Sequence, residues 1–353
     1  SILGAGFSSS EDLVLSGSVS QANVFGTGNR LTTQINSGSV NTVYSLSHTN
    51  PYYTIDGISL GYDLYRRDVD AEEIDDVSAY ETSTIGAGVR FGLPVNERDF
   101  ISFGLTYEQT SVTIDPVYDP LVGPSSYQLF VGLDQSTRDD DSLRLDTSWA
   151  RDTRNSFLFP TKGLFQRAAV EVGTPLGSLQ YYKLSFQHQQ FFPLSKRFTL
   201  MLNGEVGIGG GLGDEELPFF KNFYAGGTSS VRGFANGTLG PKDYYGDALG
   251  GDTRVVGNAE LFFPLPGIKD DQSLRMSAFI DAGATFGPNN RNSDGVLDGR
   301  YEKFAFEDLR YSAGVAILWV SPMGPLKFSL AQPLVEKDRD ETEVFQFTLG
   351  NVF

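Results

Sequence analysis

The 353-residue sequence contains no cysteine, and it has only two histidines, two tryptophans and three methionines. The lack of cysteine excludes a disulfide framework and any metal site that depends on thiolate ligands. No apolar run approaches the ~18 residues that a transmembrane helix requires, and the amphipathic periodicity of helices is nearly absent. These absences favour one large β architecture over a set of soluble domains.

A strongly basic surface is also missing, because the formal net charge is −17. Nucleic acid is therefore not an expected partner, since phosphate binding needs a stripe of positive charge. The negative charge gathers in three runs between strand-like segments, at 68–76, 138–141 and 336–343. We interpret these runs as solvated loop tips, and the alternative is a role in binding divalent cations or lipopolysaccharide.

The residues of a catalytic site do not come together in the sequence. His48 and His188 fall on the apolar faces of their strands, as expected for histidines at a membrane interface. No serine, histidine and carboxylate can be assembled to face one pocket. The stretch "NSDGVLDG", at 292–299, has part of the spacing of a calcium loop but lacks the remaining ligands. We expect no enzymatic activity, no cofactor and no metal site.

What the sequence does contain is a period of two. In "RFTLMLNGEVGI", which starts at Arg197, apolar residues and glycine alternate with mainly polar residues. The stretches "YYKLSFQHQQFF", from Tyr181, and "SLRMSAFIDAG", from Ser273, alternate in the same way. One-sided alternation that recurs along the whole chain predicts strands with one apolar and one polar face.

The spacing of the turns favours a membrane barrel over a soluble sheet. Short turns beside aromatic residues and proline, as in "FFPLSKR" and "FGLPVNERD", alternate with longer polar connections. Short turns on one rim, long loops on the other and aromatic residues at strand ends are typical of outer-membrane barrels. The sequence thus predicts an all-β, 16-stranded antiparallel transmembrane β-barrel over residues 1–353, with short periplasmic turns and long extracellular loops.

One segment leaves the number of strands open. Ser125 to Gln135, "SSYQLFVGLDQ", would make a seventeenth strand and would place the two termini on opposite rims; we interpret it as structure within a long outer loop. The sixteen expected strands lie near residues 1–8, 12–21, 30–38, 42–50, 57–68, 79–94, 98–113, 142–152, 164–174, 179–192, 197–208, 254–264, 274–283, 309–320, 325–333 and 343–353.

Closure of this barrel requires the first strand to pair with the last, because an open edge in lipid leaves backbone groups unsatisfied. The first strand is short and holds two glycines, and the last carries a glycine close to its end, so we expect this seam to be the weakest in the wall. The residues of the seam are Ile2, Leu3, Gly4, Ala5, Gly6 and Phe7 on the first strand, with Phe345, Phe347, Leu349, Gly350 and Phe353 on the last.

A single arginine, Arg232, lies in the glycine-rich stretch "FYAGGTSSVRGFANGTLGPK" of a long connection over 209–253. The glycines allow the loop to fold into a narrow space. Inside a lumen the guanidinium would need a carboxylate, because an unpaired buried charge is strongly destabilising. Strand parity turns Glu260 and Asp281 inward on the next two strands. Arg232 either pairs with these two acids or is solvated at the loop tip.

The tetrapeptide "VRGF", formed by Val231, Arg232, Gly233 and Phe234, resembles the signature of the outer-membrane protein assembly superfamily. The segments "NVFGTGNRL", "DTRNSFLFPTKG", "LWVSPMGPLKFSLAQP" and "FQFTLGNVF" are similar to one branch of it, the central subunits of the β-barrel assembly machinery. Autotransporter assembly factors and two-partner secretion translocators share the tetrapeptide alone. The resemblance to this branch covers nearly the whole chain.

The resemblance implies a site and a mechanism. The loop that carries the tetrapeptide, loop six, is expected to fold into the lumen, where Arg232 pairs with Glu260 and Asp281. A lateral gate is expected to open between the first and last strands, with Gly350 at the position of a kink in the last strand. The implied function is the assembly and insertion of β-barrel proteins in the outer membrane of the bacterial cell.

The resemblance also implies partners. They are nascent outer-membrane β-barrel proteins, membrane lipid and lipopolysaccharide, and the lipoproteins of the assembly machinery. Members of this branch carry periplasmic domains before the barrel, and none is found in this sequence. We therefore expect an isolated barrel that lacks most of the lipoprotein-binding surface. A translocator or secretion pore of the same superfamily, or a passive porin, is the alternative function.

Overall fold

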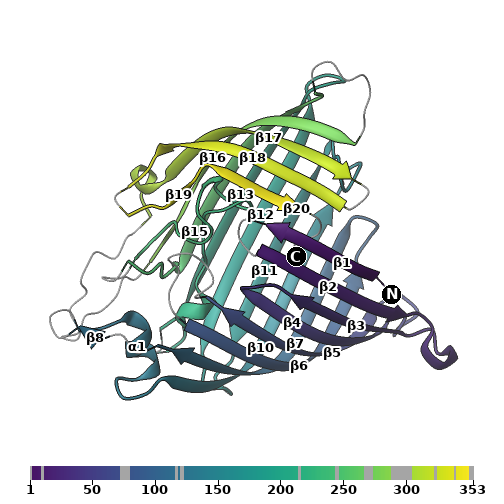
Figure 1. The fold of residues 1–353 in the computed structure, drawn as a ribbon. Coiled ribbons are helices and arrows are strands. Elements are labelled where there is room, and N and C mark those ends of the chain that lie inside the picture. Colours follow the sequence, from purple (N-terminus) through teal and green to yellow (C-terminus); the bar gives the residue numbers. More distant parts are fainter. Residues whose placement is uncertain are drawn as a thin grey trace.

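The computed structural model describes residues 2–8, 12–71, 80–115, 118–119, 123–213, 216–242, 246–265, 273–287, 304–321, 324–337 and 339–349. Sixteen antiparallel strands in this part of the chain close into a barrel (Figure 1). In barrel order they are β1 (Ile2–Ser8), β2 (Asp12–Gln21), β3 (Arg30–Ser37), β4 (Asn41–Asn50), β5 (Ser59–Asp70), β6 (Tyr80–Pro94), β7 (Asp99–Ile114), β10 (Thr137–Asp152), β11 (Gly163–Gly173), β12 (Tyr181–Pro193), β13 (Thr199–Gly211), β15 (Thr253–Phe263), β16 (Leu274–Phe286), β17 (Arg310–Ser321), β18 (Gly324–Val335) and β20 (Phe345–Leu349).

The barrel confirms the predicted fold, and all sixteen predicted strands are present in the predicted order. The largest difference at a strand start is in β10, which begins at Thr137 rather than near 142. The acidic run 138–141 is therefore part of a strand, and its interpretation as a loop tip was wrong. Thr137 to Asp141 pair with Thr113 to Gln109 of β7, and Arg138 forms an ion pair of 2.8 Å with Asp140.

The acidic run at 336–343 is a solvated loop tip only in part: Glu336 is exposed, residue 338 lies outside the described residues, and the Asp340 side chain is buried. Asp340 forms a buried ion pair with Arg310, in which Nε lies 2.9 Å from Oδ2 and both side chains are less than 5 % exposed. Lys337 of the same run pairs with Asp308. These pairs hold Lys337 and Asp340 against the start of β17, so the charges at these two positions are not free in solvent. In the run at 68–76, residues 72–76 lie outside the described part of the chain.

The three longest connections, 115–136, 212–252 and 287–309, lie on one rim because the strands alternate in direction. The short 3₁₀ turn η1 (Val24–Gly26) lies on the opposite rim.

The first long connection contains the β8 (Tyr118–Asp119) and β9 (Gly123–Pro124) pair and the helix α1 (Ser126–Val131), and the third contains η3 (Phe306–Asp308). Ser125 caps α1 by accepting a hydrogen bond from the N–H of Gln128 at 3.2 Å. Structure within a long loop is thus confirmed for this segment, and it adds no strand to the barrel.

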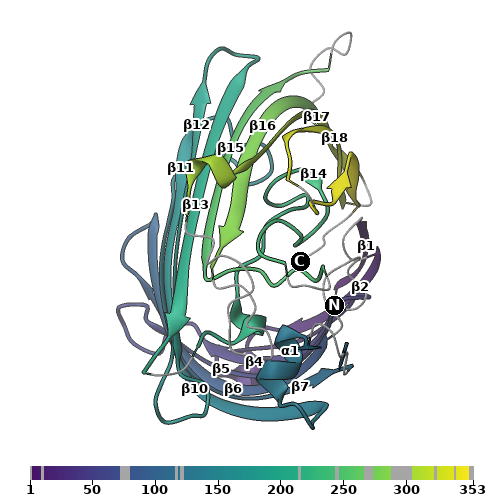
Figure 2. The ribbon, with the colours of Figure 1, turned by 90° about the vertical axis from the view of Figure 1, so that its left-hand side faces the viewer.

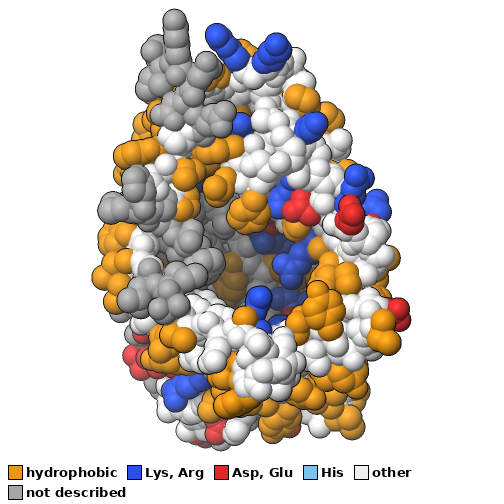
Figure 3. All heavy atoms as spheres, turned by 90° about the vertical axis from the view of Figure 1, so that its right-hand side faces the viewer, with side chains coloured by type: hydrophobic (Ala, Val, Ile, Leu, Met, Phe, Trp, Pro, Cys, Tyr) orange, Lys and Arg blue, Asp and Glu red, His pale blue; other side chains and the backbone are white. Residues whose placement is uncertain are grey.

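Strand parity separates a lipid-facing surface from a polar interior. On β13, Leu202 and Val206 face outward and are 43 % and 45 % exposed, whereas Met201 faces inward and is buried. The same alternation exposes Ile280 and buries Asp281 on β16. Figure 3 shows a hollow that contains Lys and Arg side chains and is bordered in part by hydrophobic ones. This arrangement is that of an outer-membrane barrel.

No helix in the described part of the chain is long and apolar enough to cross a membrane.

Loop six, residues 212–252, folds back inside the barrel wall (Figure 2). It contains the 3₁₀ turn η2 (Phe219–Lys221) and the two-residue strand β14 (Gly233–Phe234), which pairs with β19 (Thr342–Glu343) just before β20. Val231 and Phe234 are fully buried in an apolar cluster that also includes Val256 of β15. The tetrapeptide is therefore packed against the inner face of the wall.

Candidate functional site

Arg232 binds two carboxylates on neighbouring strands of the inner wall. Its Nε donates to Oδ2 of Asp281 at 2.7 Å, and its Nη2 donates to Oδ1 at 2.8 Å. Nη1 donates to Oε1 of Glu260 at 3.2 Å, and the backbone N–H of Arg232 donates to Oδ2 of Asp281 at 3.1 Å. The structure thus brings together the three residues that strand parity and the VRGF resemblance singled out.

Neighbouring polar groups fix the two carboxylates. The Ser277 hydroxyl donates to Oε1 of Glu260. The side-chain amide of Asn258 donates to Oδ1 of Asp281 at 2.8 Å and to the carbonyl of Ser230 at 2.7 Å. The guanidinium carbon of Arg232 also lies 3.3 Å from the centre of the Phe279 ring. Asn258 therefore ties the loop backbone to the carboxylate that binds the arginine.

The charges of this cluster are almost fully removed from solvent. Arg232 is 3 % exposed, Glu260 is 5 % exposed and Asp281 is 0 % exposed. Burial alone lowers the pKa of the Arg232 guanidinium, but the hydrogen bonds and charges of Asp281 and Glu260 outweigh it and raise that pKa above its ordinary value. Lys327 of β18 lines the adjoining polar cavity of about 180 Å³ together with Arg232 and Glu260. The arrangement is a permanently charged anchor for loop six.

Two glycines allow loop six to approach the wall and its own backbone closely. Gly233 has φ +90°, and a Cβ atom on it would lie 3.0 Å from the Cβ of Ala331 on β18. Gly226 has φ +109°, and a Cβ there would lie 2.3 Å from the carbonyl oxygen of Ala235. A side chain at either position would strain the backbone and clash with its neighbour.

We expect Gly233→Ala to loosen loop six. Strain at positive φ costs about 1–3 kcal/mol, and contact with Ala331 adds to it. The measurement is the temperature at which the folded band converts to the unfolded band on a gel, together with protease cleavage of the loop. Gly246→Ala is the matched control, because Gly246 has φ +97° and open space around its Cβ direction. Equal effects of the two variants would show that the close approach to β18 is unimportant.

A second anchor holds the first part of loop six. Nζ of Lys221 lies 3.5 Å from Oε2 of Glu108 on β7 and 3.3 Å from Oε1 of Glu171 on β11. Beside it, the Phe219 ring packs edge to face on Tyr127 of α1, with ring centres 4.6 Å apart. Sequence reasoning missed this anchor. The inward parity of the two glutamates was the available signal, and nothing local pairs them with a lysine in a loop.

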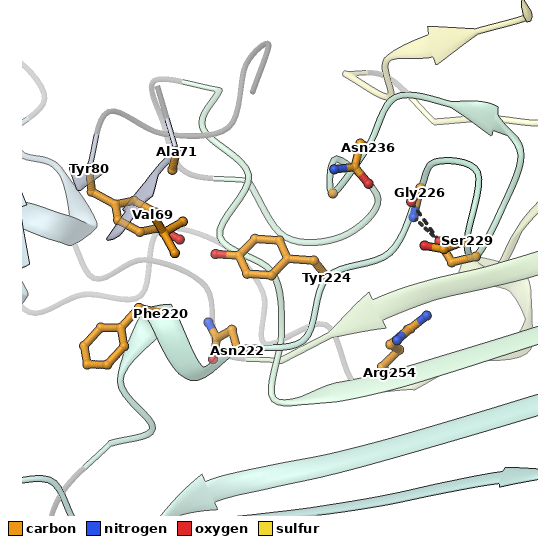
Figure 4. A pocket seen from close by; sticks show the side chains of 12 residues that line it. Val69, Ala71, Tyr80, Phe220, Asn222, Tyr224, Gly226, Ser229, Asn236 and Arg254 are labelled. Carbon is orange, nitrogen blue, oxygen red and sulfur yellow. Dashed lines mark hydrogen bonds between the residues drawn. The ribbon is translucent and has the colours of Figure 1, made fainter. Parts of the chain in front are cut away.

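Loop six leaves a cavity of about 390 Å³ on the side of β5 and β6. Figure 4 shows Tyr224 extending from the loop toward Val69, with Asn222 and Asn236 on either side. Arg254 of β15 lines the same space. The lumen is therefore only partly filled, although the loop crosses it and is held at two points.

The seam between β1 and β20 is the shortest pairing in the wall among the described residues. Phe7 lies opposite Leu349 and Ser8 opposite Thr348. By contrast, all seven residues of β1 pair with β2, and all five residues of β20 pair with β18. The rings of Phe7 and Phe347 stack across the seam with their centres 5.5 Å apart. Within the described part of the chain, residues 2–6 have strand partners on β2 only.

The other predicted seam residues lie on β1, on β20 or beyond the described residues. The backbone of Ile2 and Leu3 belongs to β1, opposite Ser18 and Gly17, and Gly4, Ala5 and Gly6 follow in the same strand. Phe345 is 50 % exposed on the outer face of β20. Gly350, with its expected kink, and Phe353 lie outside the described residues, as does the stretch at 292–299.

The fold, the buried VRGF arginine and the short seam can be compared with known proteins. A family model described as the Omp85 superfamily domain matches residues 23–353. The chain belongs to the Omp85 superfamily. Two bacterial relatives are named outer membrane proteins, and the structure is a β-barrel. This chain is therefore a protein of the bacterial outer membrane.

The Omp85 chain is similar to several proteins of this family. It is 42 % identical to outer membrane protein assembly factor BamA of Neisseria meningitidis over 99 % of its own length and 46 % of that protein. It is 28 % identical to BamA from Haemophilus ducreyi lacking POTRA domains 1-3, with a TM-score of 0.88 over 98 % of this chain and 69 % of that one. The fold is shared by CdiB from Acinetobacter baumannii, with a TM-score of 0.57. The two chains are 13 % identical, and the match covers 98 % of this chain and 58 % of CdiB. The chain spans about half the length of the curated relatives it matches.

Proposed function

We propose that this chain assembles β-barrel proteins and inserts them into the bacterial outer membrane through a lateral gate between β1 and β20. The short seam carries this proposal, because two residue pairs join the described parts of strands that are otherwise fully paired. The resemblance to assembly factors named BamA supports the same function.

The proposed reaction is the addition of a strand and involves no covalent step. When the seam opens, the N–H and C=O groups of β1 lose their partners on β20, and a hydrocarbon environment makes unpaired backbone groups costly. An incoming strand that pairs with β1 satisfies those groups and gains its own hydrogen bonds. The exposed β1 edge thus acts as a template, and the next strands of the substrate pair with the first.

Loop six has a supporting part in this mechanism. Its two anchors, at Arg232 and Lys221, keep it across the lumen. A substrate is therefore directed sideways through the seam into the lipid rather than straight through the barrel. Arg232, Glu260 and Asp281 are positioning residues in this proposal and do not contact the substrate.

The proposed partners follow from this mechanism. Nascent outer-membrane β-barrel proteins are the substrates, and the lipoproteins of the assembly machinery are partners of the whole protein. Membrane lipid and lipopolysaccharide surround the outer face, where Leu13, Leu15 and Val19 of β2 are more than half exposed beside the seam. These apolar side chains next to the gate are suited to receive a substrate strand that carries an apolar face.

The proposal predicts that vesicles containing the protein accelerate the folding of an unfolded outer-membrane barrel relative to protein-free vesicles. It also predicts low conductance in a planar bilayer, because loop six crosses the lumen. Folding is followed by protease resistance and by the shift of the folded band on a gel. A large steady conductance without accelerated folding would favour a porin or a secretion pore of the same superfamily instead.

A further inference from the structure

The side chain of Gln346 joins loop six to the last strand of the barrel. It points inward from β20 and is 1 % exposed. Its Oε1 accepts a hydrogen bond from the N–H of Gly233 at 3.2 Å, and its Nε2 donates to the carbonyl of Phe234 at 2.8 Å. One amide therefore satisfies both a donor and an acceptor of the VRGF backbone, which are separated from it by more than a hundred residues of sequence.

The backbone just before β20 is paired with the same part of loop six. Gly233 lies opposite Glu343 and Phe234 opposite Thr342 in the sheet of β14 and β19. The N–H of Ala235 then donates to the carbonyl of Glu341 at 2.9 Å, which extends this pairing. Loop six thus holds the chain immediately before β20 by backbone bonds, and Gln346 extends this hold into β20 itself.

Loop six contacts the two sides of the seam unequally. Its hydrogen bonds reach β20 through Gln346, whereas in the described part of the chain none reaches β1. Gly233, which binds Gln346, directly follows Arg232, which binds Asp281 and Glu260. A peptide that is fixed to the inner wall by an ion pair therefore also fixes the start of β20.

We propose that Gln346 is a positioning residue that couples the docked loop six to β20 and keeps the start of this strand in the wall when the seam opens. This inference rests on the proposed opening between β1 and β20. The strand then separates from β1 beyond Gln346, while its beginning stays attached to Arg232 through Gly233. A glutamine meets the requirement because its amide both donates and accepts. Leucine at this position would remove both of these hydrogen bonds from the VRGF backbone, although the Phe234 carbonyl still accepts from the N–H of Gly227 at 3.0 Å.

The first test is hydrogen exchange of the Gln346→Leu barrel in the absence of substrate. We expect amide exchange in Phe345–Leu349 to accelerate about tenfold or more, with exchange in β10, β11 and β12 unchanged. Ser329→Ala is the matched control: the Ser329 hydroxyl donates to the carbonyl of Gln346 at 3.3 Å, so it ties β18 to β20 without loop six. This control is expected to leave the exchange of β20 close to that of the unmodified protein.

The second test restores the link by covalent means. Cysteines replace Ala235, which directly follows β14, and Glu341, which directly precedes β19. These two residues are joined by a backbone hydrogen bond, at a spacing that suits a disulfide. In the Gln346→Leu background the oxidised pair is expected to restore the slow exchange of β20. The reduced double-cysteine protein is the reference, since Glu341→Cys also removes an ion pair with Lys242.

Three outcomes would overturn the coupling: unchanged exchange of β20 in Gln346→Leu, an equal acceleration over the whole wall, or no recovery in the oxidised pair. An equal acceleration would mean that Gln346 contributes only to overall stability. Exchange is measured without a substrate, so these results do not depend on whether the chain inserts other proteins. A failed insertion assay would remove the proposed function and leave the link between loop six and β20 to be judged by exchange alone.

Discussion

Replacing Arg232 with alanine is expected to lower the free energy of unfolding of the barrel by about 3–5 kcal/mol. The variant leaves Asp281 and Glu260 as buried carboxylates without the guanidinium that binds both. It also releases the centre of loop six, so protease cleavage between the two anchors should increase. Urea unfolding in lipid vesicles measures the effect through the fluorescence of Trp149 and Trp319, which lie on β10 and β17.

Two further variants separate the anchor from a general loss of charge. Arg90→Ala breaks an ion pair with Asp63 at 3.2 Å, but the Arg90 side chain is 49 % exposed, so a loss of at most about 1 kcal/mol is expected. Combining Arg232→Met with Glu260→Gln and Asp281→Asn should recover part of the stability, because the two side chains that lose the guanidinium are then neutral. A loss in Arg232→Ala as small as in Arg90→Ala would contradict the anchor.

The inward position of Glu260 and Asp281 could be predicted because a strand has a period of two. Once Ala259 and Ile280 are assigned to the lipid face, the residues next to them must face the lumen. The sixteen strands could be predicted for the same reason, since lipid on one side and a polar interior on the other impose alternation along each strand. The order of the strands followed from sequence because each pairs with the next in the chain.

Where lipid does not impose alternation, the sequence was less informative. The first residues of β10, from Thr137 to Asp141, extend its pairing with β7. Because their side chains are polar on both faces, the sequence of this stretch is that of a loop. The contacts of Lys221 and Gln346 depend on the path of loop six through the lumen. Their partners lie far away in sequence, and no local pattern records which loop residue reaches which wall residue.

A disulfide between Phe7→Cys and Leu349→Cys is expected to abolish the assembly of other barrels. The two residues lie opposite each other in the seam, and antiparallel partners have a Cα spacing that suits a disulfide. The chain has no other cysteine, so oxidation creates one defined link. With β1 and β20 joined, the edge of β1 is no longer available to an incoming strand.

The matched control is a disulfide between Phe7→Cys and Leu13→Cys, which lie opposite each other on β1 and β2. It removes the same Phe7 ring and its stacking on Phe347, but it leaves the seam free to open. Oxidation of this pair should therefore leave assembly unchanged. A similar loss of assembly in both pairs would mean that cross-linking β1 to any neighbour is harmful.

The proposed lateral gate is tested most directly by the rate of substrate folding in vesicles that contain the Phe7→Cys and Leu349→Cys protein, compared before and after reduction. The double-cysteine variant is produced in the native host, so that the machinery partners are present. Substrate folding is expected at the rate of protein-free vesicles when the seam is oxidised, and assembly should recover when the disulfide is reduced. Undiminished assembly with every seam cross-linked would contradict the lateral gate.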